Sequence, residues 1–374
     1  MESGGQMTSR VTDTAPRALV LIGTKAQLIK MAPILRLMDE EGVPYQLVYS
    51  GQHSETFEEL ERLFGLRAAD DVLVSDFEAA THASFARWTL RFWGAAIKRL
   101  AKGAWRGCRI GLVHGDTAST LFAAIAMRLA GVPVAHVEAG LRSPRLFDPF
   151  PEELVRRLVS RLSRWHYVPD ASAAANLAQS RGEVIDTGGN TLRDALAFAL
   201  ERMDDTQAGS GGYGVVSIHR NENLSSRQRF DDLMQMVVET AAKCPIKFVL
   251  HPATRARVAA SGWDRRLSAA PGLELVGRMD YLQFTRTLLR STFLMTDGGS
   301  NQEEAAMLGL PTLLLRMETE RSDGLGDNVV LSRLEPGVIG AFVDRHAGQP
   351  WSPKIVEGPS PSANIVAHVR SSLR

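Results

Sequence analysis

The sequence of 374 residues is poor in cysteine, nearly neutral and without a long uninterrupted apolar run. Its two cysteines, Cys108 and Cys244, cannot form a disulfide framework and lack the spacing of a metal site, which favours a reducing cytoplasm. A net charge of +1 provides no bulk attraction to nucleic acid. The longest apolar stretch, residues 119–137, is interrupted by an arginine, a glycine and a proline, so we expect no membrane span.

Motifs for metals and common cofactors are missing as well. There is no HExxH, no paired CxxC, no Asp-rich calcium loop and no Walker pattern. The loop at residues 298–304 is not a GxGxxG dinucleotide loop, and "HGDTAS" is not the GxSxG of serine hydrolases. We therefore expect neither a metal ion nor another cofactor. Residues 1–15 lack the apolar core of a signal peptide, and we expect a disordered leader there.

Short apolar segments alternate with helical patterns along the whole chain, which is typical of parallel sheets covered by helices on both faces. The pattern restarts after residues 183–190, which we interpret as a crossing segment. We expect an α/β fold with two doubly wound Rossmann-like domains that face each other across a cleft. The predicted parts are a domain at 16–186, a second domain at 187–355, and a C-terminal helix at 356–374 that returns to the first domain.

Polar residues and glycines gather where the predicted strands end. Ligands of such folds bind beyond the carboxyl ends of the strands, so these positions are candidates for function. They are Gly23 and Thr24, His114 to Asp116, Glu138, His219 and Arg220, His251, and Asp297 to Ser300.

Three carboxylates in this set have two interpretations each. Asp116 is either a helix N-cap or a functional acid. Glu138 ends an apolar strand, so it is either a proton-transfer group with a raised pKa or a buried ion-pair partner of Arg142 or Arg145. Glu152 begins a helix, where its charge would also offset the helix dipole.

The candidate cations are equally open. His219 and Arg220 form an anion-facing pair at the end of a strand. Lys25 and Lys30 follow the first strand, although Lys30 also fits a solvated helix position. His136 is interpreted as a core histidine with its hydrogen bonds satisfied.

The stretch "MTDGGSNQEE" places two adjacent carboxylates, Glu303 and Glu304, behind a glycine loop at a helix start. Acids in the first turn offset the helix dipole. The alternative is that Gly298, Gly299 and Ser300 hold a phosphate while one carboxylate holds what is attached to it.

Five ordered segments resemble the bacterial non-hydrolysing UDP-N-acetylglucosamine 2-epimerases, which have the GT-B fold. The resemblance covers most of the chain. The segments are "GLVHGDTAST", "PVAHVEAGLRSPRLFDPFPEELVRR", "DTGGNTLRDAL", "HRNEN" and "TDGGSNQEE".

This resemblance implies roles for individual residues. The implied catalytic residues are Asp116, Glu138, Glu152 and His219. The implied UDP-binding residues are Lys25, Lys30, Arg220, Phe284 against the uracil, Gly298, Gly299, Ser300, and Glu304 on the ribose. A second sugar-nucleotide site is implied at Gln52, His53 and His251. It also implies a homodimer, a UDP-sugar substrate, a role in polysaccharide biosynthesis, and epimerisation by elimination and re-addition of UDP.

The chain departs from the family pattern at two loops. The family's GTRPE is GTKAQ here, so Lys25 replaces an arginine and Gln27 replaces a glutamate. TDSGG is TDGGS, which moves a hydroxyl. Three alternatives therefore remain beside the epimerase: a hydrolysing epimerase that releases UDP, a GT-B glycosyltransferase, and a non-enzymatic sugar-nucleotide sensor.

Overall fold

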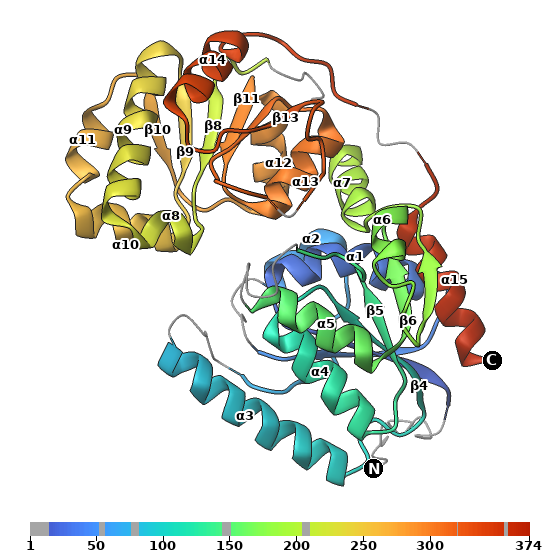
Figure 1. Cartoon of the computed structure of the whole chain (residues 1–374). Helices are drawn as coiled ribbons and strands as arrows, with labels where there is room; N and C mark the ends of the chain where they lie inside the picture. The colour runs from blue at the N-terminus through green and yellow to red at the C-terminus, as the bar shows by residue number, and fades with distance from the viewer. Residues whose placement is uncertain are drawn as a thin grey trace, which may run out of the picture. The chain divides into compact units, whose positions relative to one another are not determined.

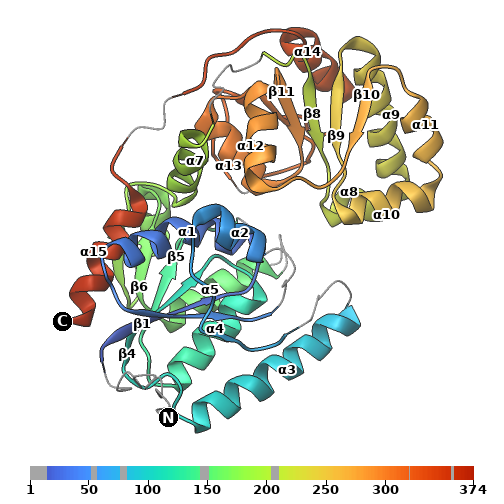
Figure 2. The ribbon, with the colours of Figure 1, turned by 180° about the vertical axis from the view of Figure 1, so that it is seen from behind.

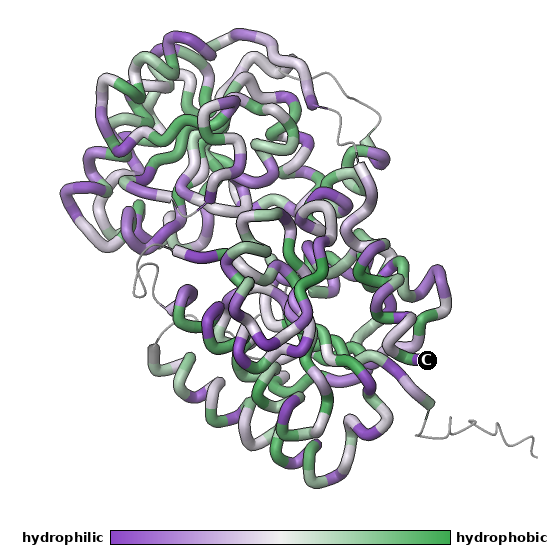
Figure 3. Tube along the Cα trace, turned by 45° about the vertical axis from the view of Figure 1, so that its right-hand side comes forward, coloured by the Kyte–Doolittle hydropathy of each residue, from purple (hydrophilic) through white to green (hydrophobic). Residues whose placement is uncertain are grey.

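Buried apolar strands form two separate parallel sheets, one in each of two compact units (Figure 1). The computed structural model describes residues 15–51, 57–75, 82–143, 151–203, 210–319, 321–354 and 358–374. Unit 1 comprises Met1–Ala195 with Gly358–Arg374, and unit 2 comprises Leu196–Glu357. Hydrophobic residues follow the strands in the interior of each unit (Figure 3).

The sheet of unit 1 has the order β3-β2-β1-β4-β5-β6-β7, and all its pairs are parallel. Its central strands are almost wholly apolar because helices cover both faces. In register, Val20 lies opposite Leu47 on one side and Leu112 on the other. The strands are β1 (Arg17–Ile22), β2 (Tyr45–Tyr49), β3 (Asp71–Val72), β4 (Cys108–His114), β5 (Val134–Val137), β6 (Ser163–Val168) and β7 (Glu183–Asp186).

Two sets of helices pack on this sheet (Figures 1 and 2). One contains α1 (Lys25–Glu40), α2 (Phe57–Phe64) and the C-terminal α15 (Pro361–Leu373), which packs on α1, β1 and β4. The other contains α3 (His82–Ala101), α4 (Ala118–Leu129) and α5 (Glu152–Leu162). The short α6 (Ala171–Ala175) precedes β7, and α7 (Leu192–Glu201) spans the boundary between the units.

Unit 2 repeats the same arrangement in the order β10-β9-β8-β11-β12-β13. Its strands are β8 (Gly214–Ser217), β9 (Ile246–Val249), β10 (Leu273–Val276), β11 (Phe293–Thr296), β12 (Thr312–Leu314) and β13 (Val329–Leu331). Its helices are α8 (Asn221–Ser225), α9 (Arg227–Lys243), α10 (Pro252–Ser261), α11 (Asp264–Ala269), α12 (Tyr281–Arg290), α13 (Gly299–Leu308) and α14 (Pro336–His346).

The predicted α/β class with two Rossmann-like sheets is confirmed. The interpretation of residues 183–190 as a crossing segment is wrong for its first half, because β7 pairs with β6 and completes the first sheet. In each sheet the strand order reverses at one point, between β1 and β4 and between β8 and β11. Ligands of doubly wound folds bind at such switch points. Across the described ranges, no helix is long and apolar enough to span a membrane.

Candidate functional site

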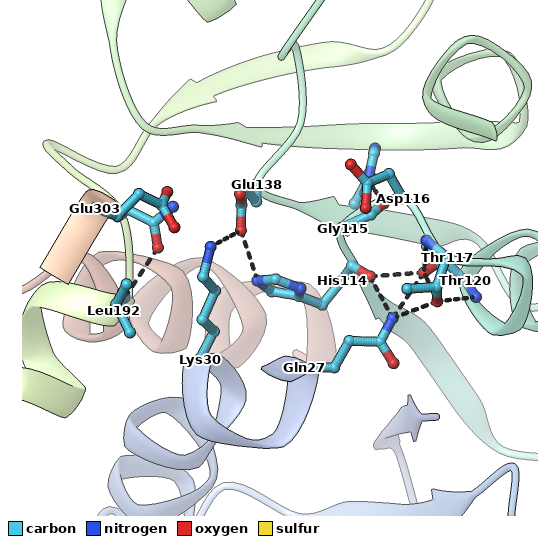
Figure 4. Close-up of polar contacts among 12 residues, drawn as sticks. Gln27, Lys30, His114, Gly115, Asp116, Thr117, Thr120, Glu138, Leu192 and Glu303 are labelled. Carbon is cyan, nitrogen blue, oxygen red and sulfur yellow. Dashed lines mark hydrogen bonds and ion pairs between the residues drawn. The ribbon is translucent and has the colours of Figure 1, made fainter. Parts of the chain in front are cut away.

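The side chain of Gln27 connects the strand ends at the switch point of unit 1 by hydrogen bonds (Figure 4). Its Oε1 accepts from the backbone N–H of Gly23 at 2.7 Å and of Thr24 at 3.1 Å, and thereby caps α1. Its Nε2 donates to the carbonyl of His114 at 2.8 Å and also lies 2.9 Å from Thr117 Oγ1. Gln27 therefore joins the end of β1 to the end of β4, and a glutamate could not donate the bond to His114.

Glu138 follows β5 and lies between two basic groups (Figure 4). Its Oε2 is 2.6 Å from Lys30 Nζ and 3.1 Å from His114 Nε2, and all three side chains are buried. The backbone of Glu138 has φ of 62°, a left-handed conformation that is strained for a residue with a side chain. A buried, strained and charge-paired carboxylate at a strand end is characteristic of functional sites.

The contacts of Glu138 and Lys30 correct one interpretation offered above and part of another. Glu138 forms its buried ion pair with Lys30, whereas Arg142 donates to Leu141 and Ser160. Arg145 lies outside the described residues. Lys30 is not a solvated helix residue, because its side chain is only 5% exposed and its ammonium faces Glu138.

Asp116 is not the N-cap of α4. Thr117 caps that helix through a reciprocal pair of bonds with Thr120. The carboxylate of Asp116 instead accepts from Arg156, at 2.8 Å from Nε and 2.6 Å from Nη2. Asp116 and Glu138 therefore lie at the ends of neighbouring strands, each beside a buried cation.

The two acids at the start of α5 differ in their surroundings. Glu153 is fully buried and accepts from the backbone N–H of Ser143 at 2.9 Å and from Arg157 at 2.7 Å. Sequence reasoning assigned Glu153 no role. These contacts compensate for the burial of its charge. Glu152 is the first residue of α5, and one of its carboxylate oxygens is buried.

His136, which was interpreted as a core histidine, lies inside unit 1. Its side chain is buried on β5 and its Nε2 bonds the carbonyl of Gly115 at 2.7 Å. Burial lowers the pKa of His136 to about 3, so the ring is neutral and Nε2 carries the proton that it donates. The predicted core position is confirmed, whereas the expectation that all its hydrogen bonds are satisfied is not, because Nδ1 is buried without a hydrogen-bond partner among the described residues.

At the switch point of unit 2, a buried carboxylate holds the loop after β8. Asp297 follows β11, is 0% exposed, and accepts from the backbone N–H groups of His219 at 2.9 Å and Arg220 at 3.0 Å. It also accepts from Asn223 Nδ2 at 2.9 Å. Asp297 thus positions the His-Arg pair. The sequence placed Asp297 among the candidates at strand ends without a specific role, and it did not single out Asn223.

His219 remains partly accessible, with its side chain 34% exposed. Burial lowers its pKa, whereas Asp297, whose Oδ1 lies 3.4 Å from His219 Nδ1, raises it. The net shift is downward, so the ring is mainly neutral at pH 7. Its ring centroid is 5.4 Å from that of His251, which belongs to the predicted second sugar-nucleotide site. Gln52 and His53 of that site lie outside the described residues.

The glycines at the start of α13 leave space that neighbouring side chains occupy. A Cβ on Gly298 would lie 2.7 Å from His219 Cε1, and a Cβ on Gly299 would lie 3.0 Å from Arg321 Nε. Both carboxylates that follow are buried and therefore do more than offset a helix dipole at the surface. Glu303 forms an ion pair with Arg321.

Glu304 has a different neighbour. Together with burial, it raises the pKa of the Tyr281 hydroxyl well above the usual value. Tyr281 begins α12, the helix that also carries the half-buried Phe284. Ser300 and Lys25 are half-buried near the starts of α13 and α1. Neither Arg321 nor Tyr281 was singled out from the sequence.

These observations define a class of protein. Two parallel sheets of Rossmann strand order carry carboxylates at one switch point and a glycine loop with cations at the other, which is an α/β architecture of the GT-B class. Residues 36–350 match the family model described as UDP-N-acetylglucosamine 2-epimerase. The chain belongs to this family of isomerases, as its sequence segments predicted.

Individual relatives agree. The chain is 31% identical over 335 residues to the UDP-N-acetylglucosamine 2-epimerase of Neisseria meningitidis serogroup A, covering 84% of this chain and 86% of the relative. A crystal structure of the Neisseria meningitidis epimerase bound to UDP-GlcNAc matches with a TM-score of 0.76 and 26% identity, over 94% of this chain and 98% of that one. A putative epimerase from Listeria monocytogenes matches with a TM-score of 0.77 and 26% identity, over 95% and 96%.

Proposed function

We propose that this protein interconverts UDP-N-acetylglucosamine and UDP-N-acetylmannosamine. The observation that carries the proposal is Glu138, a buried carboxylate in a strained conformation between Lys30 and His114, at the switch point where a ligand would enter. The activity of the related epimerases, one of which was crystallised with UDP-GlcNAc, supports the same reaction.

In the proposed reaction, a carboxylate removes the proton from C2 of the sugar while the C1–O bond breaks and its electron pair leaves with UDP. This gives a 2-acetamidoglucal. UDP then re-adds at C1 as a proton is delivered to the opposite face of C2. The C2 proton is weakly acidic, so cleavage at C1 must assist its removal. Asp116, Glu138 and Glu152 share the roles of base, acid and stabiliser of the charge that develops at C1.

Unit 2 is proposed to hold the leaving group. The start of α13 at Gly298 to Ser300 would receive the diphosphate, because backbone N–H groups there have no partner within the helix. His219 and Arg220 would stabilise the charge that develops on departing UDP. Phe284 would stack on the uracil and Glu304 would bind the ribose.

The remaining assignments are part of the same proposal. UDP contacts of Lys25 and Lys30 stay predictions, as does the second sugar-nucleotide site. Lys30 has a further proposed role, since an ammonium at 2.6 Å favours the ionised form of Glu138. We also propose that the protein is a cytoplasmic homodimer. Light scattering after size-exclusion chromatography would measure its mass.

Proton NMR of UDP-N-acetylglucosamine with the protein in deuterated water tests the reaction. We expect deuterium to enter C2 while signals of UDP-N-acetylmannosamine grow. UDP with free N-acetylmannosamine would instead indicate a hydrolysing epimerase. UDP release that requires an acceptor would indicate a glycosyltransferase. Binding without turnover of any UDP-sugar would indicate a sensor.

A further inference from the structure

The segment from His114 to Asp116, where β4 ends, is held by a different element at each of its three residues (Figure 4). Gln27 of α1 donates to the carbonyl of His114 at 2.8 Å, and Arg156 of α5 pairs with the carboxylate of Asp116. The middle residue, Gly115, has φ of 68°, a left-handed conformation that glycine adopts without steric cost. Gly115 has no side chain, so only its backbone groups can fix it in place.

Both backbone groups of Gly115 are bound by β5. Its N–H donates to the carbonyl of Val137 at 3.1 Å, and its carbonyl accepts from His136 Nε2 at 2.7 Å. Glu138 is the next residue along the chain. One short segment therefore carries the carboxylate of Glu138 and also holds the residue that directly precedes Asp116.

The imidazole of His136 makes this contact from inside unit 1. Its side chain is buried, and burial lowers its pKa to about 3, so the ring is neutral at pH 7 and Nε2 carries the proton that it donates. Among the described residues, Nδ1 has no hydrogen-bond partner. An apolar side chain would fill the same space without the cost of burying a polar ring. The contribution of His136 beyond packing is therefore its bond to Gly115.

We propose that His136 is a positioning residue, which acts through the carbonyl of Gly115 to fix Asp116 relative to Glu138. The inference rests on the proposed function and adds a residue to it. Epimerisation needs one group to remove the C2 proton and another to deliver a proton to the opposite face. The acids on either side of one carbon must keep fixed positions, because a displacement of about 1 Å can slow an enzyme about 100-fold.

Turnover of UDP-N-acetylglucosamine, followed by proton NMR, tests this role in the full-length protein. His136→Met fills the space without a donor, so we expect kcat to fall about tenfold or more while KM changes little. His136→Gln retains an N–H that can reach the carbonyl of Gly115, and it should recover most of the activity. His136→Asn carries the same amide on a side chain that is shorter by one methylene, so it should be as slow as His136→Met.

His166→Met is the matched control. His166 is the register partner of His136 on the neighbouring strand β6, it is also buried, and its Nε2 bonds Ser180 Oγ at 2.7 Å. Each methionine variant removes one hydrogen bond of a buried histidine, so urea denaturation should show a similar loss of stability for both. Only His136→Met should lose turnover, because the printed bond of His166 is made away from Gly115.

The inference is overturned if His136→Met turns over the substrate as fast as the wild-type protein, and the proposed function then stands. An equal loss of turnover in His166→Met would also overturn it, because the loss would then report general damage to the sheet. If His136→Met fails to fold, the two amide variants decide, and equal kcat values of His136→Gln and His136→Asn would contradict a role for the bond to Gly115. If the wild-type protein epimerises no UDP-sugar, the inference and the proposed function fall together.

Discussion

The two switch points have the same strand topology and different chemistry. In unit 1, the carboxylates of Glu138 and Asp116 face the side chains of Lys30 and Arg156. In unit 2, the carboxylate of Asp297 is buried beneath the loop and accepts from backbone N–H groups. The cations Arg220 and Arg321 lie around the start of α13, where Arg321 forms an ion pair with Glu303.

This difference is the basis for proposing a separate role for each unit. The Rossmann strand order determines where loops converge, and the side chains at the strand ends determine what those loops can do. In the proposed function, the carboxylates of unit 1 exchange the proton of the sugar. In the same proposal, the N–H donors and cations of unit 2 bind the diphosphate. The predictions below test whether this division of roles is real.

Removing one partner of the buried pair in unit 1 should have the largest effect. Lys30→Met leaves Glu138 buried without its ammonium, so we expect the free energy of unfolding to fall by about 3–5 kcal/mol. Urea denaturation measures this change. Lys98→Met, at an exposed position of α3, is the control and should be nearly neutral. Equal stability of the two variants would show that the buried pair is energetically unimportant.

Glu138→Gln tests the chemistry of the same site. Its carbonyl still accepts a bond from Lys30, so the protein should fold and bind UDP. We expect epimerisation to fall by about 100-fold or more, because an amide cannot exchange the C2 proton. NMR measures the rate of epimerisation and calorimetry measures UDP binding, so the two properties are determined separately. Glu40→Gln, an exposed partner of Arg36, is the control. Near-normal turnover would remove Glu138 from the catalytic set.

Local patterns in the sequence predict much of this fold. The apolar runs of β1 and β4 and the glycine loop before α13 can be recognised within a few residues. Three strands escaped detection. β7 was interpreted as part of a crossing segment, and β3 and β13, with two and three residues, are too short for a periodic signal.

The partners at the site depend on distant segments. Lys30 and Glu138 are 108 residues apart, so no local pattern can indicate that their side chains meet. The candidates offered for Glu138, Arg142 and Arg145, are close to it in the sequence. Arg142 bonds other groups, Arg145 is not described, and the ion pair that the structure shows is with Lys30 on α1. Arg321 was missed for the same reason, because its position depends on a hydrogen bond from Gln302.

Asp297→Asn tests the buried carboxylate that holds the loop after β8 in unit 2. An amide retains one acceptor oxygen and turns N–H groups toward donors that previously met a carboxylate. We expect a loss of about 1–3 kcal/mol in the free energy of unfolding, from a buried donor left without its bond. UDP affinity should fall as well, because His219 and Arg220 lose their anchor. Asp344→Asn, on the exposed face of α14, is the control for both measurements.

The two units also contain histidines in different environments, and the pH dependence of stability can distinguish these environments. His136 of unit 1 has a pKa lowered by burial to about 3, whereas an unfolded histidine titrates near 6.5. Between these values the unfolded chain binds more protons, so stability is present at neutral pH and is lost as the pH falls. The loss from this residue should reach about 2 kcal/mol at pH 5.

His136→Gln removes this titration and can still donate an N–H to Gly115. Its unfolding free energy should therefore fall less than that of the wild-type protein between pH 7 and pH 5, as measured by urea denaturation at each pH. His166, whose pKa burial lowers to about 4, is present in both proteins, so its contribution cancels. Parallel pH profiles would mean that His136 accepts a proton in the folded state. A proton would then reach the buried His136 of unit 1 as readily as the partly exposed His219 of unit 2.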